Sequence, residues 1–251
     1  GPIIHNPVRD RAAVERLKML DDSDLQYVMD AISLTRKMLA GRVPLIGFAG
    51  APFTLASYAI EGGSSRNYIH TKQMMYGEPD VWHRLMDKFA RVITGYLRRQ
   101  IKAGAQAVQL FDSWVGCLSA GDYAEYVMPH VQLIFDGLKH EGVPLIHFGT
   151  GTTAILKSMR QAGGDVIGID WRIPLDEAWA MVGYDRTVQG NLDPVTLFGP
   201  IHEIERRVAD ILRRAAGRPG HIFNLGHGIL PNTPVEHVAA TIDLVHKLSA
   251  R

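Results

Sequence analysis

The sequence predicts an α/β fold built on a parallel sheet, and it favours a (β/α)8 TIM barrel slightly over an open doubly wound sheet. Short apolar runs recur along the 251 residues, and an amphipathic stretch follows each run. No Gly-x-Gly-x-x-Gly follows an early strand, so the usual dinucleotide-binding signal of the open sheet is missing. About six strand–helix units can be counted, whereas a closed barrel needs eight. We therefore expect one barrel domain over residues 1–251, with its first βα units absent from the chain.

The expected strands are short and contain β-branched or aromatic residues, which is typical of parallel strands buried on both faces. They cover residues 44–48, 107–111, 144–148, 165–169, 187–190 and 221–225. Apolar residues at three- and four-residue spacing predict helices over residues 22–39, 80–103, 122–140, 151–162, 174–182, 201–216 and 234–249. Thr152 or Thr153 is expected to open one helix, and Thr233, followed by Pro234, to cap the last.

Composition narrows the class of protein. The formal net charge is +1, which gives no reason to expect a nucleic-acid or membrane partner. No apolar run reaches 18 residues, so no membrane span is expected. The single cysteine, Cys117, excludes a disulfide within the chain and a multi-cysteine metal site. The start has neither an initiator Met nor the form of a signal peptide, so we expect upstream residues to be missing. The lone cysteine fits a reducing compartment, and we expect the protein to be cytoplasmic.

The active site is expected at the carboxyl ends of the strands, where parallel α/β proteins carry their ligands. The residues there are small, hydroxyl-bearing or aromatic, with one imidazole, which suits a bulky and partly apolar ligand with polar appendages. In Gly226-His227-Gly228 the glycines permit a sharp turn and close ligand approach. His227 could donate a hydrogen bond to an anion or shuttle a proton, or it could merely satisfy the turn backbone.

Two further candidates lie near strand ends. Ser113 could donate its hydroxyl to a carboxylate or cap the next helical segment, and Asp112 before it could be a buried acceptor. Tyr58 lies one to two turns into a helix, where its ring could pack on the core and its hydroxyl reach the pocket. A purely packing role for Tyr58 is the alternative. The arginine pairs at 98–99, 206–207 and 213–214 are interpreted as solvated helix faces.

Neither a phosphate loop nor a metal cluster is evident. The sequence has no Gly-x-x-x-x-Gly-Lys-[Ser/Thr] run. Its eleven histidines are scattered and have no carboxylate or cysteine partner at ligand spacing. We therefore expect an enzyme with a pocket, without a metal and without an organic cofactor.

Three segments resemble one known family. Residues 47–62, Gly-Phe-Ala-Gly-Ala-Pro-Phe-Thr-Leu-Ala-Ser-Tyr-Ala-Ile-Glu-Gly, are similar to the signature of the uroporphyrinogen decarboxylases. The fixed Gly-Phe, Pro-aromatic-Thr-Leu, Tyr and Glu-Gly elements of that signature are all present. Residues 109–113 and 224–229 resemble two later segments of the family, and the similarity covers nearly the whole chain.

The resemblance implies a (β/α)8 barrel that forms a homodimer with facing clefts. Its expected activity is the removal of CO2 from the four acetate side chains of uroporphyrinogen III, giving coproporphyrinogen III, with neither metal nor cofactor. Tyr58, Ser113 and His227 match family positions that contact the substrate. The catalytic aspartate and the carboxylate-binding arginines belong to the family's N-terminal portion, and neither motif is found in this chain. No catalytic residue is therefore expected here, and the chain by itself is expected to be inactive.

Two alternatives remain at this point. Zinc-dependent corrinoid or cobalamin methyltransferases share the fold and use a His-x-Cys at the corresponding strand, whereas this chain has His147-Phe148-Gly149. A non-catalytic tetrapyrrole-binding homologue is the other, although the segments around Tyr58 and His227 do not look decayed.

Overall fold

The six strands form one parallel sheet in which each strand pairs with the next one in the sequence. The computed structural model describes residues 3–21 and 23–250. The strands are β1 (Ile46–Gly50), β2 (Ala107–Asp112), β3 (Leu145–Gly149), β4 (Val166–Gly168), β5 (Thr187–Gln189) and β6 (His221–Ile222). An unbroken β1 to β6 order is that of a barrel, because a doubly wound sheet reverses its order at a switch point. The predicted parallel sheet and the count of six units are confirmed.

The sheet remains open in the described part of the chain. There β1 pairs with β2 and β6 with β5, and no pairing joins β6 to β1. The inner face of the sheet is correspondingly uncovered at these two edges, where Phe48 and Ile222 are exposed. The strand order is thus that of a barrel, without its closure among these residues.

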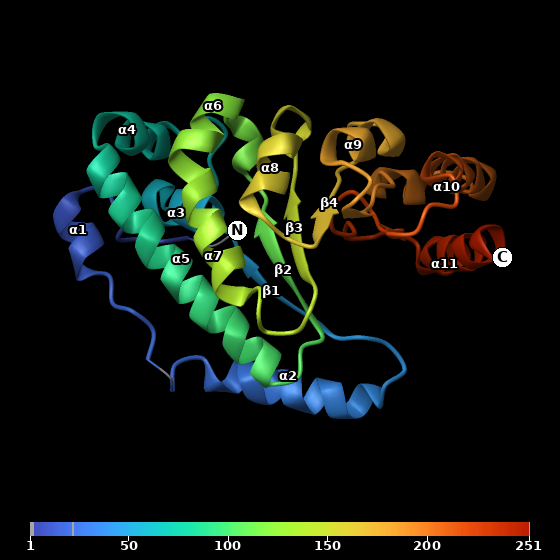
Figure 1. Cartoon of the computed structure of the whole chain (residues 1–251), viewed down its shortest axis with the longest axis horizontal. Coiled ribbons are helices and arrows are strands. Elements are labelled where there is room, and N and C mark those ends of the chain that lie inside the picture. Colours follow the sequence, from blue (N-terminus) through green and yellow to red (C-terminus); the bar gives the residue numbers. More distant parts are fainter. Residues whose placement is uncertain (1–2, 22, 251) are drawn as a thin grey trace.

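Helices cover the other face of the sheet (Figure 1). The helices of the described residues are α1 (Arg11–Arg16), α2 (Gln26–Leu39), α3 (Pro52–Glu61), α4 (Ile69–Gly77), α5 (Pro79–Lys102), α6 (Ala120–Asp122), α7 (Met128–Leu138), α8 (Leu156–Ala162), α9 (Leu175–Val182), α10 (Ile201–Ala215) and α11 (Val235–Ser249). A π-helical turn, η2 (Tyr123–Val127), joins α6 to α7, and 3-10 turns cover Val115–Cys117, Thr153–Ile155 and Pro194–Phe198. The helix predicted over residues 122–140 is therefore several segments, and α1 and α4 were not predicted.

Both predicted threonine caps are wrong. The hydroxyl of Thr233 donates to the carbonyl of Leu230 at 2.7 Å, and α11 begins after Pro234. Thr152 precedes a 3-10 turn without a side-chain cap bond, and Thr153 lies inside that turn. The helix predicted from residue 22 begins at Gln26; residue 22 lies outside the described residues.

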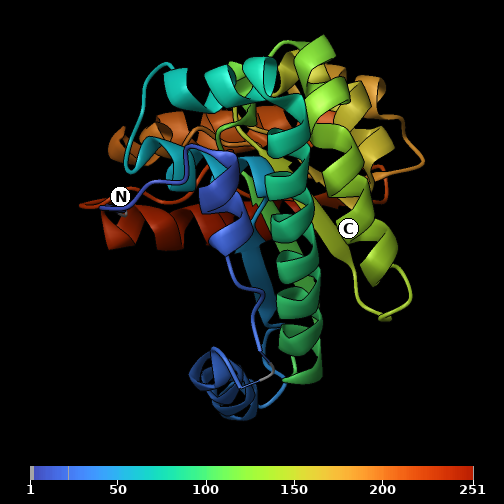
Figure 2. The same ribbon diagram turned by 90° about the vertical axis from the view of Figure 1, so that its left-hand side faces the viewer.

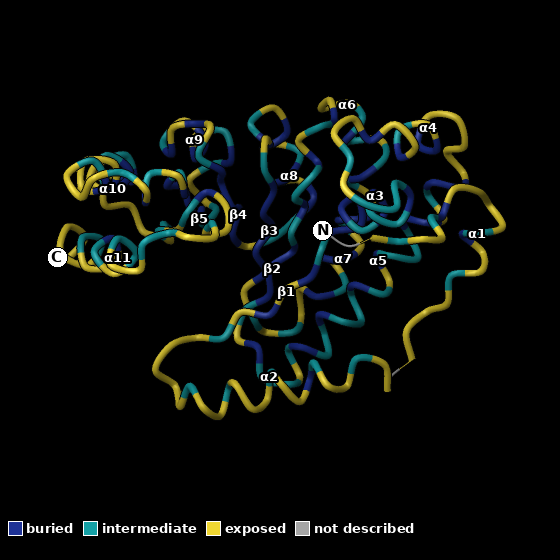
Figure 3. The backbone as a smooth tube through the Cα atoms, turned by 180° about the vertical axis from the view of Figure 1, so that it is seen from behind, coloured by how far each residue is buried: buried dark blue, intermediate teal, exposed yellow. Residues whose placement is uncertain are grey.

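The core lies between the sheet and its helices. The long helix α5 presents a buried row that includes Leu85, Ile93 and Leu97 at helical spacing. Trp82 of α5 donates its indole N–H to the carbonyl of Tyr126 at 2.8 Å, which ties α5 to the π-helical turn. Helix α2 lies apart from this core at the base of the molecule in Figures 1 and 2. Figure 3 shows the burial concentrated in the sheet and along α5, with α2 largely exposed.

Strand residues alternate between the two faces of the sheet. Val108 and Leu110 pack in the helix-side core, whereas Phe48, Phe111 and Phe148 share the inner face. The three rings are arranged edge to face, with centroids 5.8 Å and 5.7 Å apart. The inner face is therefore aromatic next to the carboxyl edge of β1 to β3.

One carboxylate is fully enclosed on the helix side. Among the described residues, neither carboxylate oxygen of Asp112, the last residue of β2, has a hydrogen-bond partner, and the hydroxyls of Thr54 and Tyr123 are also buried without one. Burial raises the pKa of Asp112 to about 7, although the nearby Thr54 hydroxyl works in the opposite direction. Burial also raises the pKa of Tyr123 well above its usual value, with the charge of Asp112 adding to that rise. Asp112 is buried, as one interpretation of the sequence had it, but no hydrogen bond to its carboxylate is found among the described residues.

The burial of Asp112 predicts a pH-dependent difference between the wild type and Asp112→Asn. The folded-state pKa of Asp112 lies above the unfolded value of 3.8, so its contribution to stability is complete below about pH 4 and is lost as pH rises through about 7. The variant should therefore gain stability relative to wild type over that window, by at most about 4 kcal/mol. Urea unfolding at several pH values measures the difference. Asp136→Asn on the surface of α7 is the control, and parallel pH curves for wild type and Asp112→Asn would contradict the prediction.

Helix α7 offers a matched test of the core. Leu138 is 1% exposed and Leu133 is 51% exposed. Leu138→Ala should destabilise the fold by about 2–5 kcal/mol, because it removes buried methyl groups and leaves a cavity. Leu133→Ala should change stability by less than about 0.5 kcal/mol. Equal losses in chemical denaturation would show that the face of α7 is wrongly assigned.

Candidate active site at the carboxyl edge of the sheet

The three predicted substrate-binding residues follow three different strands at one edge of the sheet. Tyr58 lies on α3 after β1, Ser113 follows β2, and His227 follows β6. Parallel pairing brings the ends of these strands to the same side, but no direct contact joins the three residues among those described. Hydrogen bonds between the loops after β2, β3, β4 and β5 connect this edge of the sheet.

Tyr58 is held by the early start of α3. Pro52 is the first residue of that helix, two positions after β1 ends, so Tyr58 falls in the second turn as predicted. Its half-buried ring meets the ring of Trp114 edge to face, with centroids 6.2 Å apart. The ring centroid of Trp114 also lies 6.5 Å from that of Tyr68. The ring of Tyr58 thus packs on an aromatic group from the neighbouring loop.

Ser113 lies in the turn directly after β2. Its carbonyl accepts a hydrogen bond from the hydroxyl of Thr150 at 2.6 Å, which joins the loops after β2 and β3. The predicted capping role is wrong, because the next helical turn follows Trp114 and has no side-chain cap bond. In the described part of the chain the Ser113 hydroxyl has no protein partner, which leaves it available to a ligand.

The buried carboxylate of Asp170 connects the loop after β3 to the loop after β4. Its Oδ2 accepts the backbone N–H of Gly151 at 2.5 Å, and its Oδ1 accepts the N–H of Arg172 at 3.0 Å. Its backbone carbonyl accepts the side-chain N–H of Asn191 at 2.9 Å, which brings in the loop after β5. The sequence places Asp170, Arg172 and Asn191 just after strands, but it did not predict that they connect loops. Their hydrogen-bond partners lie in other loops, which the local sequence does not show.

His227 lies exposed at the far end of this series of loops. Its ring meets the ring of Trp171 edge to face, with centroids 6.2 Å apart. Its Nδ1 is 3.4 Å from the carbonyl oxygen of Gly228, a weak contact at most. A Cβ at position 226 would lie 2.5 Å from the backbone nitrogen of Trp171, so only glycine lets these loops pack this closely. The turn backbone therefore depends little on the imidazole, which is free to meet a ligand.

His147 lies away from this edge. It is fully buried on the helix side of β3, where its ring centroid is 5.2 Å from that of Phe135. Burial lowers its pKa to about 4, so the imidazole is neutral near pH 7. Cys117 belongs to the loop after β2, and its carbonyl accepts the ammonium of Lys72 at 2.8 Å. In residues 3–21 and 23–250, no group of three His, Cys, Asp or Glu side chains is arranged to hold a metal ion.

None of the helices in the described part of the chain combines the length and apolar character needed to cross a membrane.

Solved structures with the same fold include a methyltransferase from Methanosarcina mazei, with a TM-score of 0.77 and 18% sequence identity. The match covers 99% of this chain and 71% of that one. The putative vitamin-B12-independent methionine synthase of Listeria monocytogenes aligns with a TM-score of 0.64 and 9% identity, over 93% of this chain and 72% of that one. At these identities the likeness concerns the fold alone, and it supports a TIM-barrel-like architecture.

Sequence relatives are much closer. The uroporphyrinogen decarboxylase of Sorangium cellulosum is 59% identical over 99% of this chain and 71% of its own length. That of Carboxydothermus hydrogenoformans is 55% identical over 100% of this chain and 72% of its own length. The family model described as uroporphyrinogen decarboxylase (URO-D) matches residues 1–248. The family model covers nearly the whole chain and the sheet is parallel and barrel-like, so the chain belongs to the uroporphyrinogen decarboxylase family.

Proposed function

We propose that this protein is a carboxy-lyase that converts uroporphyrinogen III to coproporphyrinogen III in tetrapyrrole (heme) biosynthesis. The observation that carries the proposal is the match of the family model to residues 1–248, with curated uroporphyrinogen decarboxylases at 49–59% identity. In each of four steps one acetate side chain loses CO2 and becomes a methyl group. The carbon–carbon bond to the carboxylate breaks and a proton takes its place, so no oxidant or reductant is needed.

The substrate itself can supply the electron sink. A pyrrole is electron-rich, so protonation of its α-carbon gives a cationic ring that accepts the electron pair released with CO2. The methylene carbon is then protonated and the α-carbon loses its proton. The protein has to hold the pyrrole N–H groups and stabilise the transient cation, which is electrostatic preorganisation, and it has to position the substrate carboxylates. The proposal therefore includes neither a metal nor an organic cofactor.

Tyr58, Ser113 and His227 are proposed to bind the substrate. The unpartnered hydroxyl of Ser113 and the exposed imidazole of His227 are hydrogen-bond donors suited to carboxylates. Tyr58 has an apolar ring packed on Trp114 and a hydroxyl at its tip, which suits a ligand with apolar and polar parts. None of the three is proposed as the acid that protonates the pyrrole.

We further propose that the protein is a cytoplasmic homodimer in which the active-site clefts of the two subunits face each other. Its partner is proposed to be a small molecule and not a nucleic acid, since a net charge of +1 gives no strong attraction to a polyanion. Light scattering on the purified protein measures the subunit number, and a monomer at enzyme concentrations used in the assay would refute the dimer.

The activity is tested on uroporphyrinogen III under anaerobic reducing conditions, with products separated by carboxylate number. Because the curated relatives are longer than the matched region, the complete gene product containing this sequence is assayed beside the 251-residue chain. Stepwise appearance of seven-, six-, five- and four-carboxylate porphyrinogens is expected, and exhaustive chelation should leave the rate unchanged. A folded complete protein that releases no CO2 would refute the proposed function.

Single substitutions test the three residues. Tyr58→Phe, Ser113→Ala and His227→Ala should each lower kcat/KM by about tenfold or more, because each removes a hydrogen bond to a charged group. The matched controls are Tyr27→Phe on α2 and His202→Ala on α10, whose side chains are exposed away from this edge. Losses in the controls equal to those in the candidates would remove the reason for placing the substrate here.

A further inference from the structure

Arg172 presents a fixed guanidinium at the carboxyl edge of the sheet. Its Nη1 donates to Oδ2 of Asp170 at 2.6 Å, and its guanidinium carbon lies 3.9 Å from the centroid of the Trp171 ring. An ion pair on one side and an aromatic face on the other hold the flat group in one orientation. The cost of ordering a long side chain is therefore met before any ligand arrives.

The charge that reaches solvent at this point is positive. The Arg172 side chain is 49% exposed, whereas that of Asp170 is 1% exposed and also accepts two backbone N–H groups. The Nε and Nη2 groups of Arg172 have no protein partner among the described residues. An anion can thus approach free N–H donors without meeting the carboxylate behind them.

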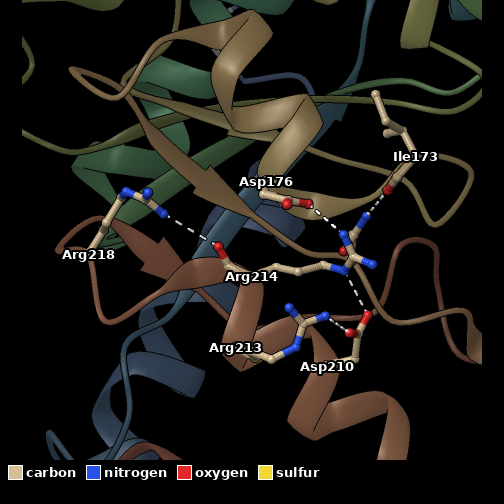
Figure 4. A network of polar contacts seen from close by, with 7 residues as sticks. Ile173, Asp176, Asp210, Arg213, Arg214 and Arg218 are labelled. Carbon is tan, nitrogen blue, oxygen red and sulfur yellow. Dashed lines mark hydrogen bonds and ion pairs between the residues drawn. The ribbon is translucent and has the colours of Figure 1, made fainter.

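Neighbouring arginines differ in this respect. Figure 4 shows Arg214 held between Asp176 and Asp210, with Arg213 also directed at Asp210. Arg207 is paired with Glu203 at 2.8 Å. Each of these arginines is ion-paired with a carboxylate of α9 or α10, and none is stacked on a tryptophan ring among the described residues. Arg172, by contrast, is held by Asp170 and Trp171, and its Nε and Nη2 groups have no partner among the described residues.

The position of Arg172 relates it to the candidate site. Its aromatic support, Trp171, meets His227 edge to face, and the Asp170 carboxylate reaches Gly151, next to the Thr150 that bonds Ser113. Arg172 and His227 therefore both contact Trp171, which connects the guanidinium to the candidate site.

Resting on the proposed function, we infer that Arg172 is a further substrate-binding residue, which holds a side-chain carboxylate that the reaction does not remove. A cation paired with a carboxylate stabilises that group in the ground state and so opposes its departure as CO2. The guanidinium is thus suited to the propionate side chains, which are retained in the product. Its role is to fix the orientation of the macrocycle.

Arg172→Ala and Arg172→Gln test this role, and Arg206→Ala on the exterior of α10 is the control for a lost surface charge. The glutamine variant keeps a hydrogen bond to Asp170, and it carries the test if the alanine variant does not fold. Because the contact is to a retained carboxylate, KM should rise about tenfold or more while kcat changes little. The dissociation constant for oxidised coproporphyrin, measured by fluorescence, should rise by a similar factor.

The salt dependence provides a further measurement. The affinity of the wild type for coproporphyrin should fall more steeply with added NaCl than that of Arg172→Gln. A variant with KM and affinity within twofold of Arg206→Ala, or with reduced kcat at unchanged KM, would overturn the assignment. Wild-type protein that binds coproporphyrin through Arg172 but releases no CO2 would refute the proposed function and leave this site standing.

Discussion

Parallel pairing in chain order is the constraint on which the rest of the molecule depends. Each strand must be followed by a segment that returns to the starting edge, so helices cover the outer face and the loops leading into them collect at the carboxyl edge. Residues that are distant in the sequence, such as Tyr58 and His227, consequently lie along one surface. The same geometry leaves the inner face to be lined by alternate strand residues, of which Phe48, Phe111 and Phe148 form an aromatic row.

Hydrogen bonds between loops convert that shared edge into a defined surface. Thr150 joins the loop carrying Ser113, and Asp170 joins three loops through Gly151, Arg172 and Asn191. Asp112 ends β2 and Asp170 follows β4, yet their surroundings differ. The Asp170 carboxylate accepts hydrogen bonds from Gly151 and Arg172, whereas among the described residues the Asp112 carboxylate has no hydrogen-bond partner, and burial favours its neutral form. Two carboxyls at equivalent strand ends therefore serve different physical roles.

Sequence periodicity was sufficient for the main elements. The strands begin within two residues of their expected starts, because short β-branched runs flanked by turn residues are distinctive. The cap expected at Thr233 and the capping alternative for Ser113 were wrong, because a hydroxyl has several backbone partners within reach and local sequence does not decide among them. The function of Asp170 could not be predicted either, since its partners lie in other loops. Family resemblance selected Tyr58, Ser113 and His227, which residue chemistry alone left ambiguous.

Gly226 illustrates how a missing side chain can set a distance. The backbone at 226 approaches Trp171 and Asp170 so closely that a single added carbon would lie 2.5 Å from one and 3.0 Å from the other. Gly226 therefore fixes the separation between the backbones of the loops that carry Trp171 and His227, because contact between backbones varies less than contact between flexible side chains. Any other residue at 226 would push these two loops apart, and with them the turns that follow β4 and β6.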